Sequence, residues 1–198
     1  DTYGLDPLRY YLIKEVSFGN DGNISKNKLE DCINSDLANN YGNLCQRVTA
    51  FAEKNCSSKI PATNNFNKED LTMLNKFTDN LSILRKEIDE QNVNFYIKFI
   101  VNSLFDANKY FNDQEPWKKK EDIPRLNTIV YTSLEMIRKI SFMLYPIIPD
   151  SINKALKIFN LKTKDIVFET IGKHDYLKSG NDINRIPILF KKIEKIYD

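Results

Sequence analysis

Apolar residues recur along most of this chain in steps of three and four, the repeat of an α-helix that buries one face. The longest stripe follows Ser25, a suitable helix-capping residue, and continues to about Lys54. Asn67 and Asp122 stand at the start of two further stripes. With their caps, the expected helices cover residues 6–16, 25–54, 67–88, 93–111, 122–144 and about 150–159.

Helix ends are marked by capping and turn residues. Asp6 is expected to cap the first helix, with Pro7 at its first position. The run Asn20-Asp21-Gly22 has turn chemistry and predicts a small hairpin between Phe18 and Ile24.

The C-terminal part of the chain follows a different pattern. Two prolines in "YPIIPD" end the fifth helix, and Asp150 or Ser151 is expected to cap the sixth. Residues 161–198 have weak periodicity and are expected to be irregular. They should dock back through Ile188, Leu189 and Phe190. Short connections between amphipathic helices predict an all-α, antiparallel helix bundle.

Composition narrows the possible classes of function. The 198 residues are 41% hydrophobic, enough for one sizeable core, and the net charge of +2 requires any nucleic-acid site to be a local patch. The three cysteines lie far apart in the sequence and His174 is the only histidine, which argues against a zinc site or a disulfide framework. This usage favours a reducing, cytosolic setting. No apolar run approaches the length of a membrane span.

Catalytic chemistry has little support in the sequence. His174 stands without an evident nucleophile or acid beside it, and we expect a solvated surface histidine. Neither a Walker-type loop nor a G-x-G-x-x-G motif is present to hold phosphates. We therefore predict no catalytic residues and no metal ligands in this chain.

The helix after Ser25 carries a row of polar side chains on one shoulder of its apolar stripe. Asn43 and Arg47 are four residues apart, so they lie on the same side of a helix, and Lys54 follows seven positions later. An amide, a guanidinium and an ammonium can bond base edges and phosphates. The alternative is an ordinary solvated helix flank.

Trp117, the only tryptophan, stands in the polar stretch "DQEPWKKKED". Pro116 precedes it and Lys118 follows it. A displayed indole can stack on an unpaired base while nearby lysines contact phosphates. The alternative is a ring that closes the end of the bundle, with its N–H facing solvent.

Four stretches carry a resemblance to a known family. "YGLDPLRYYLIKEVSFGNDGNIS", "INSDLANNYGNLCQR", "DQEPWK" and "IPILFKKIE" resemble the region after the catalytic domain of methionyl-tRNA synthetase, a class I aminoacyl-tRNA synthetase. The N-terminal block is partly shared with other class I enzymes. The combination N-L-x-x-R with a later P-W is more specific to the methionine enzyme, and the resemblance covers essentially the whole chain.

The resemblance implies a layout and a role. Residues 1–25 would form a connective segment that contacts the inner corner of tRNA, residues 26–160 the anticodon-binding bundle, and residues 161–198 an extension docked on it. Asn43 and Arg47 would bond bases of a CAU anticodon, and Trp117, after Pro116, would stack on one. The two possible phosphate contacts are Lys54 and Lys118.

The family's HIGH-like and KMSKS-like signatures for ATP are absent. The chain is therefore expected to be an inactive piece of a longer cytoplasmic ligase, whose catalytic domain would use ATP and Mg²⁺ and pack on the N-terminal segment. The expected partner is tRNA(Met), and a monomer is expected because the appended OB-fold that dimerises some relatives is missing. Two alternatives stay open, a helical protein-interaction scaffold and the anticodon domain of another class I synthetase.

Overall fold

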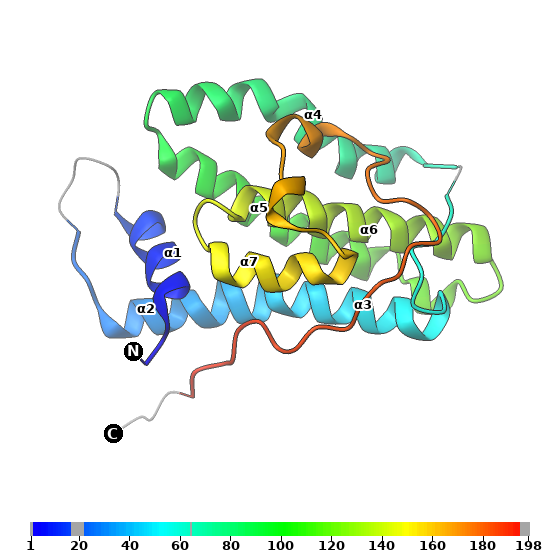
Figure 1. The fold of residues 1–198 in the computed structure, drawn as a ribbon, viewed down its shortest axis with the longest axis horizontal. Coiled ribbons are helices and arrows are strands. Elements are labelled where there is room, and N and C mark those ends of the chain that lie inside the picture. The colour runs from blue at the N-terminus through cyan, green and yellow to red at the C-terminus, as the bar shows by residue number, and fades with distance from the viewer. Residues whose placement is uncertain (1, 17–21, 64, 195–198) are drawn as a thin grey trace.

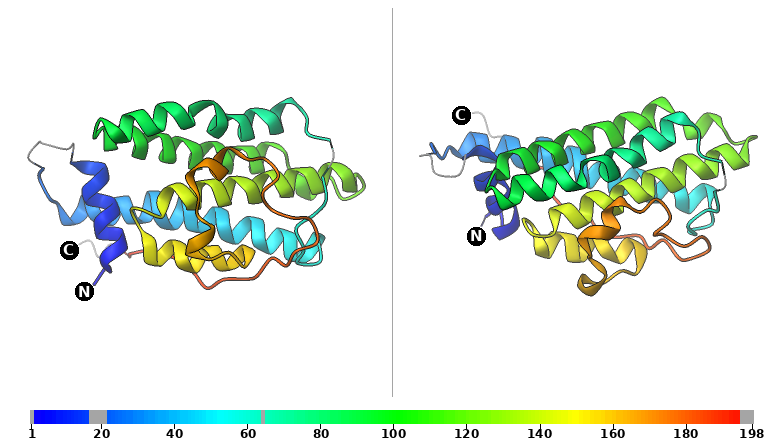
Figure 2. Two further views of the ribbon diagram at one scale, coloured as in Figure 1. Left: turned by 45° about the horizontal axis from the view of Figure 1, so that its top comes forward. Right: turned by 90° about the horizontal axis from the view of Figure 1, so that it is seen from above.

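The computed structural model describes residues 2–16, 22–63 and 65–194, and these fold into long helices packed side by side (Figure 1). The turned views show one elongated bundle crossed at one end by the first helix (Figure 2). The predicted all-α antiparallel bundle is confirmed. The hairpin predicted around Asn20-Asp21 lies outside the described residues. The described α-helices are α1 (Leu5–Glu15), α2 (Lys26–Cys32), α3 (Asn43–Asn55), α4 (Lys68–Asp89), α5 (Val93–Asp113), α6 (Ile123–Leu144) and α7 (Pro149–Ala155).

Helices α2 and α3 belong to one continuous rod, as the sequence predicted. They are joined by a π-helical segment, Ile33–Gly42, which the sequence did not predict. Apolar steps of four residues, as at Ile33, Leu37 and Tyr41, keep a buried face in either kind of helix. Periodicity alone therefore could not distinguish them. π-Helical structure is rare and occurs mostly as single turns, which are often found at functional sites.

Two of the predicted caps, Asn67 and Asp122, form with their side chains, whereas Ser25 takes the capping position of α2 without a side-chain bond. The Asn67 side chain accepts a bond from the Asp70 N–H at 3.0 Å, and the Asp70 carboxylate accepts one from the Asn67 N–H at 2.9 Å. Asp122 likewise accepts a bond from the Arg125 N–H. These bonds satisfy amides that a helix start otherwise leaves without partners.

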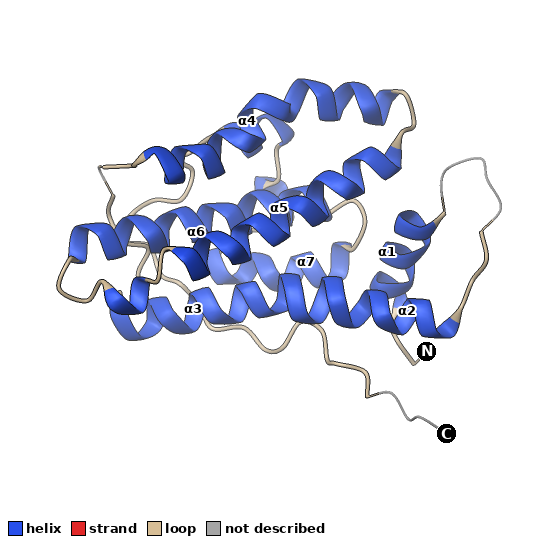
Figure 3. Cartoon of the chain, turned by 180° about the vertical axis from the view of Figure 1, so that it is seen from behind, coloured by secondary structure: helices blue, strands red, loops and turns tan. Residues whose placement is uncertain are grey.

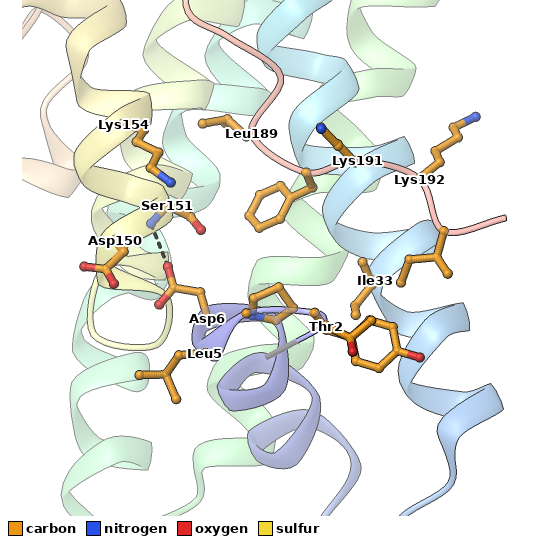
Figure 4. Close-up of a pocket in the computed structure, with 15 residues that line it drawn as sticks. Thr2, Leu5, Asp6, Ile33, Asp150, Ser151, Lys154, Leu189, Lys191 and Lys192 are labelled. Carbon is orange, nitrogen blue, oxygen red and sulfur yellow. Dashed lines mark hydrogen bonds between the residues drawn. The ribbon is translucent and has the colours of Figure 1, made fainter.

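The predicted cap of α1 is wrong. Gly4 precedes the helix, with a positive φ of 82° that suits glycine, while Asp6 lies in its first turn and Pro7 one position further on. Asp6 is buried and accepts a bond from the Ser151 N–H at 2.6 Å (Figure 4). Its carboxylate therefore caps α7 from 145 positions away.

The predicted cap of α7 is also wrong. Ile148 precedes the helix and Pro149 takes its first position. Asp150 and Ser151 both lie inside the first turn, and the carboxylate that bonds an amide of this turn comes from α1 instead.

Helix α6 is the centre of the bundle, between α3, α4, α5 and α7. Its residues are buried almost throughout, and the buried ones include three charged residues, Glu135, Arg138 and Lys139. Segment 171–177 covers them. No described helix is both long and apolar enough to cross a membrane.

The C-terminal extension is irregular, as predicted, apart from short 3₁₀ turns at Thr163–Asp165 and Phe168–Gly172. It then returns along the long α2–α3 rod (Figure 3). Phe190 is buried with its ring 6.5 Å from that of Tyr41. The docking prediction fails at Ile188, which is 62% exposed, whereas the adjacent Leu189 is half-buried.

Candidate nucleic-acid interface

A shallow hollow of about 440 Å³ lies between the α2–α3 rod and α5. We call it the asparagine groove. It brings Asn43 and Arg47 together, as their spacing predicted, and adds side chains from a second helix. The groove is lined by Ser35, Asn39, Asn40, Asn43, Arg47, Phe105, Asn108, Lys109, Asn112 and Asp113.

Two hydrogen bonds between side chains join the two walls of the groove. Arg47 donates from Nη2 to Oδ1 of Asn112 at 2.5 Å. Asn108 donates from Nδ2 to Oδ1 of Asn40 at 2.6 Å. The groove therefore has a guanidinium at one end and an amide pair at the other.

Asn43 lies between these two hydrogen bonds, on the wall formed by the α2–α3 rod. Its half-buried side-chain amide makes no hydrogen bond to any part of the chain that the structure describes. An amide carries both donors and an acceptor, so Asn43 presents unused capacity of both kinds to the groove. This is the combination that reading a base edge requires.

Trp117 lies beside the Arg47 end of the groove. Its indole is 41% exposed and meets the buried Phe111 ring edge-on, at 6.2 Å between centroids and 69° between planes. The guanidinium of Arg47 lies over that same Phe111 ring, 5.6 Å from its centroid. One phenyl ring therefore supports both candidate residues, and the indole is neither sealed inside the bundle nor free of it.

The loop that carries Trp117 is held in a tight conformation. Glu115 adopts a left-handed backbone with φ 44°, and Pro116 is buried at the first position of the short turn Pro116–Lys118. Lys118 forms an ion pair with Glu115 at 2.8 Å. The fixed φ of proline limits the conformations that the loop can adopt.

A buried ionic network anchors this loop, and sequence reasoning missed it. Arg125 donates two bonds to the Asp70 carboxylate, at 2.6 and 3.0 Å, and a third to Gln114 Oε1 at 2.5 Å. The Tyr110 hydroxyl also donates to Asp70. The network joins the starts of α4 and α6 to the end of α5. The capping position of Asp70 was visible in the sequence, but its distant partners were not.

The two lysines predicted to contact phosphates do not line the groove. Lys54 is exposed in the last turn of α3, and Lys118 is exposed in the Trp117 turn. Lys119 and Lys120 beside it are exposed as well. Their positions place positive charge around the groove rather than inside it.

Cys45 and His174 do not line the groove. Burial raises the pKa of the Cys45 thiol to about 12, which keeps it protonated at neutral pH. His174 is half-buried rather than fully solvated, with Nε2 3.1 Å from the Thr78 hydroxyl. Burial and the charge of Lys139 lower the pKa of His174.

A second hollow, of about 450 Å³, lies where α1, α7 and residues 189–193 meet (Figure 4). Lys154, Lys191 and Lys192 are among its lining residues, and the Asp6 side chain extends from α1 toward Ser151 of α7. The Oδ1 atom of Asp6 is buried without a hydrogen-bond partner among the described residues.

Comparison with protein families assigns most of the chain. Residues 60–196 match the family described as the anticodon binding domain of methionyl tRNA ligase. Residues 1–49 match the family of class I tRNA synthetases of the methionine type.

Individual relatives agree with these matches. The methionine–tRNA ligase of Brucella suis is 39% identical over 80% of this chain and 31% of its own length. The free form of Mycobacterium tuberculosis methionyl-tRNA synthetase superimposes with a TM-score of 0.91 at 30% identity, over 98% of this chain and 40% of that one. The same enzyme in complex with methionyl-adenylate gives a TM-score of 0.89 at 31% identity, over 96% and 38%. The chain thus spans about a third of the length of these relatives.

Proposed function

The chain belongs to the methionyl-tRNA ligase family, and from that premise we propose that it binds the anticodon of tRNA(Met) in the asparagine groove and on Trp117. The observation that carries the proposal is the shared support of Arg47 and Trp117 on Phe111, beside the unbonded amide of Asn43. A stacking ring and base-reading groups are thereby held within one small site.

Each residue has a distinct role in this proposal. Trp117 stacks on one unpaired base, and Pro116 limits the entropy lost when the loop is ordered by binding. Asn43 and Arg47 bond the base edges, because stacking alone cannot tell one base from another. Together they select the CAU anticodon. Lys54 and Lys118 lie outside the groove, where they reach phosphates rather than bases.

The remaining parts of the reaction belong to the rest of the parent protein. We infer that the parent joins methionine to tRNA with ATP and Mg²⁺, since it belongs with the methionine–tRNA ligases. The described chain supplies no phosphate-cradling loop, so the parent's catalytic domain must bind ATP. That domain packs on the N-terminal segment, residues 1–25, beside the hollow at Asp6.

This division gives residues 26–160 the anticodon and residues 161–198 a supporting position. We propose that the parent works on tRNA in the cytoplasm. We further propose that the parent acts as a monomer.

A fluorescence titration tests the proposal. Trp117 is the only tryptophan, so its emission reports the site without a label. We expect an RNA stem-loop with a CAU anticodon to quench it, and stem-loops with altered anticodons to require higher concentrations. Equal titration curves for all anticodons would contradict base reading by this site. No quenching at all would favour the protein-interaction scaffold.

Arg47→Ala separates base reading from general attraction of RNA. Removing the guanidinium should reduce the difference between matched and mismatched stem-loops, at about 1–3 kcal/mol per good base contact. Arg85→Ala is a matched control, because Arg85 also lies on a helix with its guanidinium 5.8 Å from a phenylalanine ring. We expect this control to preserve discrimination.

A further inference from the structure

Phe105 is an exposed aromatic residue that the proposed function leaves unused. It is 63% exposed, more than Trp117, although phenylalanine is usually buried. It lines the asparagine groove together with Asn43 and Arg47. No ring contact, cation contact or side-chain hydrogen bond involves it among the described residues.

The helical repeat places Phe105 at the opposite end of the groove from Trp117. On α5, Phe105, Asn108 and Asn112 follow at i, i+3 and i+7, so they share one face, and the first and last are about 10 Å apart along the axis. Asn112 is the residue bonded to Arg47, next to Trp117's support. Phe105 lies at the other end, beyond the Asn108–Asn40 pair.

This length matches a short run of single-stranded nucleic acid. Stacked nucleotides advance by about 3.4 Å each, so about 10 Å corresponds to three of them. Along the groove, the amides of five asparagines carry donors and acceptors, with the exposed ring of Phe105 at one end and that of Trp117 beside the other. Alternating aromatic faces and polar groups are how proteins hold and read splayed bases.

We propose that Phe105 is a second stacking surface, which takes a base of the anticodon loop different from the base on Trp117. The inference rests on the proposed function, since it deepens the description of the same RNA site. Phe105 supplies affinity through its ring face, and the asparagines between the rings supply the base-edge bonds.

Substitution of Phe105 in the complete chain tests the inference, with Trp117 emission as the readout in every variant that keeps Trp117 and filter binding for Trp117→Ala. Phe105→Ala and Phe105→Leu should weaken binding of the CAU stem-loop about tenfold. The affinity of Phe105→Tyr should stay within about twofold of that of the unsubstituted chain. Leucine keeps apolar area but has no aromatic face, so the pair Leu and Tyr isolates stacking. Phe95→Ala is the matched control, because Phe95 is exposed on the same helix but does not line the groove.

Stem-loops that lack one anticodon base at a time identify the base on Phe105. In the unsubstituted chain, removal of that base should weaken binding. In Phe105→Ala, the same removal should not weaken binding any further. Removal of the base on Trp117 should still weaken binding to Phe105→Ala.

The results separate this inference from the proposed function. Suppose that Trp117→Ala and Arg47→Ala weaken binding while Phe105→Ala binds within twofold of the unsubstituted chain. The proposal of a second stacking surface is then wrong, and the proposed anticodon site is kept. Equal binding by the Leu and Tyr variants overturns stacking as well. If the unsubstituted chain fails to bind the stem-loop, the proposed function fails and this inference fails with it.

Discussion

Arg47 in the asparagine groove and Arg138 in the centre of the bundle show two fates of a helical arginine. Arg47 makes one side-chain hydrogen bond and borders an open hollow. Arg138 is fully buried, bonded to Glu135 at 2.6 Å, and flanked by the rings of Phe142 and Tyr176 at 5.0 and 4.5 Å. A cation is available to a ligand only where the chain leaves it uncovered.

Segment 171–177 makes the difference. We call its contact with α6 the sealed layer. Glu135 accepts the Leu177 N–H at 2.7 Å, and Lys139 donates to the carbonyl oxygens of Ile171 and Lys173, each at 2.5 Å. The charges of α6 therefore attach the C-terminal extension to the bundle, while the polar residues of the groove stay uncovered.

Glu135→Ala should have the largest effect on stability. It leaves Arg138 buried without its counter-charge, which costs about 3–5 kcal/mol in the free energy of unfolding. Urea unfolding followed by circular dichroism measures the loss. Glu169→Ala is the control, because its pair with Arg85 is exposed on both sides and such pairs contribute about 1 kcal/mol or less.

The double variant Glu135→Leu with Arg138→Met distinguishes charge from packing. It should lose less stability than the two single variants together, since an apolar pair needs no counter-charge. Additive losses would show that the sealed layer does not act as a charge pair.

Trp117→Ala should produce the opposite pattern in the groove. Binding of the CAU stem-loop should weaken by about 1–3 kcal/mol, the usual contribution of one stacked base. Stability should fall by only about 1 kcal/mol, because the ring is partly exposed and meets Phe111 edge-on at the surface. A filter-binding assay is needed here, since the variant has no tryptophan. Unchanged binding by a folded variant would place RNA elsewhere.

The pH dependence of stability should report the sealed layer. Burial, followed by the charge of Arg138, lowers the pKa of Lys139 to about 7 from its ordinary value of 10.5. Between these values the unfolded chain binds more protons than the folded one, so stability should rise with pH above about 7. For one proton the slope approaches about 1.4 kcal/mol per pH unit.

Lys139→Met should remove this rise, and the free energies of unfolding at about pH 7 and about pH 8 provide the comparison. The pKa values of the cysteine thiols are raised, so these groups act in the opposite direction only as the unfolded thiols begin to ionise near about pH 8.5. An equal rise in the variant would assign the effect to another group. Lys98→Met, at an exposed position of α5, is the control.

Lys54→Ala should have the smallest effect. If Lys54 contacts one phosphate outside the groove, the variant should reduce the slope of log affinity against log salt by about 0.7 and leave anticodon discrimination unchanged. Titrations at several salt concentrations measure the slope. A change in discrimination would instead bring Lys54 into contact with bases.

Much of the fold could be predicted because its determinants are local. Asn67 and Asp122 cap helices through amides three positions away, and the apolar period identifies each buried face. Asn43 and Arg47 share a face because one helix carries both. Asp6 was misassigned because a carboxylate suited to capping its own helix bonds to Ser151 instead.

Half of the candidate site could not be predicted, because its residues meet only through contacts between different helices. The partners of Arg47 are Asn112 and Phe111, which lie on a different helix, and no local pattern pairs them with it. The exposure of Phe105 could not be predicted, since a phenylalanine among the apolar residues of a helix usually lies in the core.

The sequence by itself determined the helices, most of their ends and which side chains share a helical face, because these depend on backbone geometry within a few residues. Tertiary structure alone decided which faces meet, and so which polar groups are covered by another segment and which stay open. Coverage depends on contacts between residues distant in the sequence, such as Lys139 with Lys173 and Arg47 with Asn112. For that reason similar charged residues hold the fold together in α6 and remain uncovered in α3.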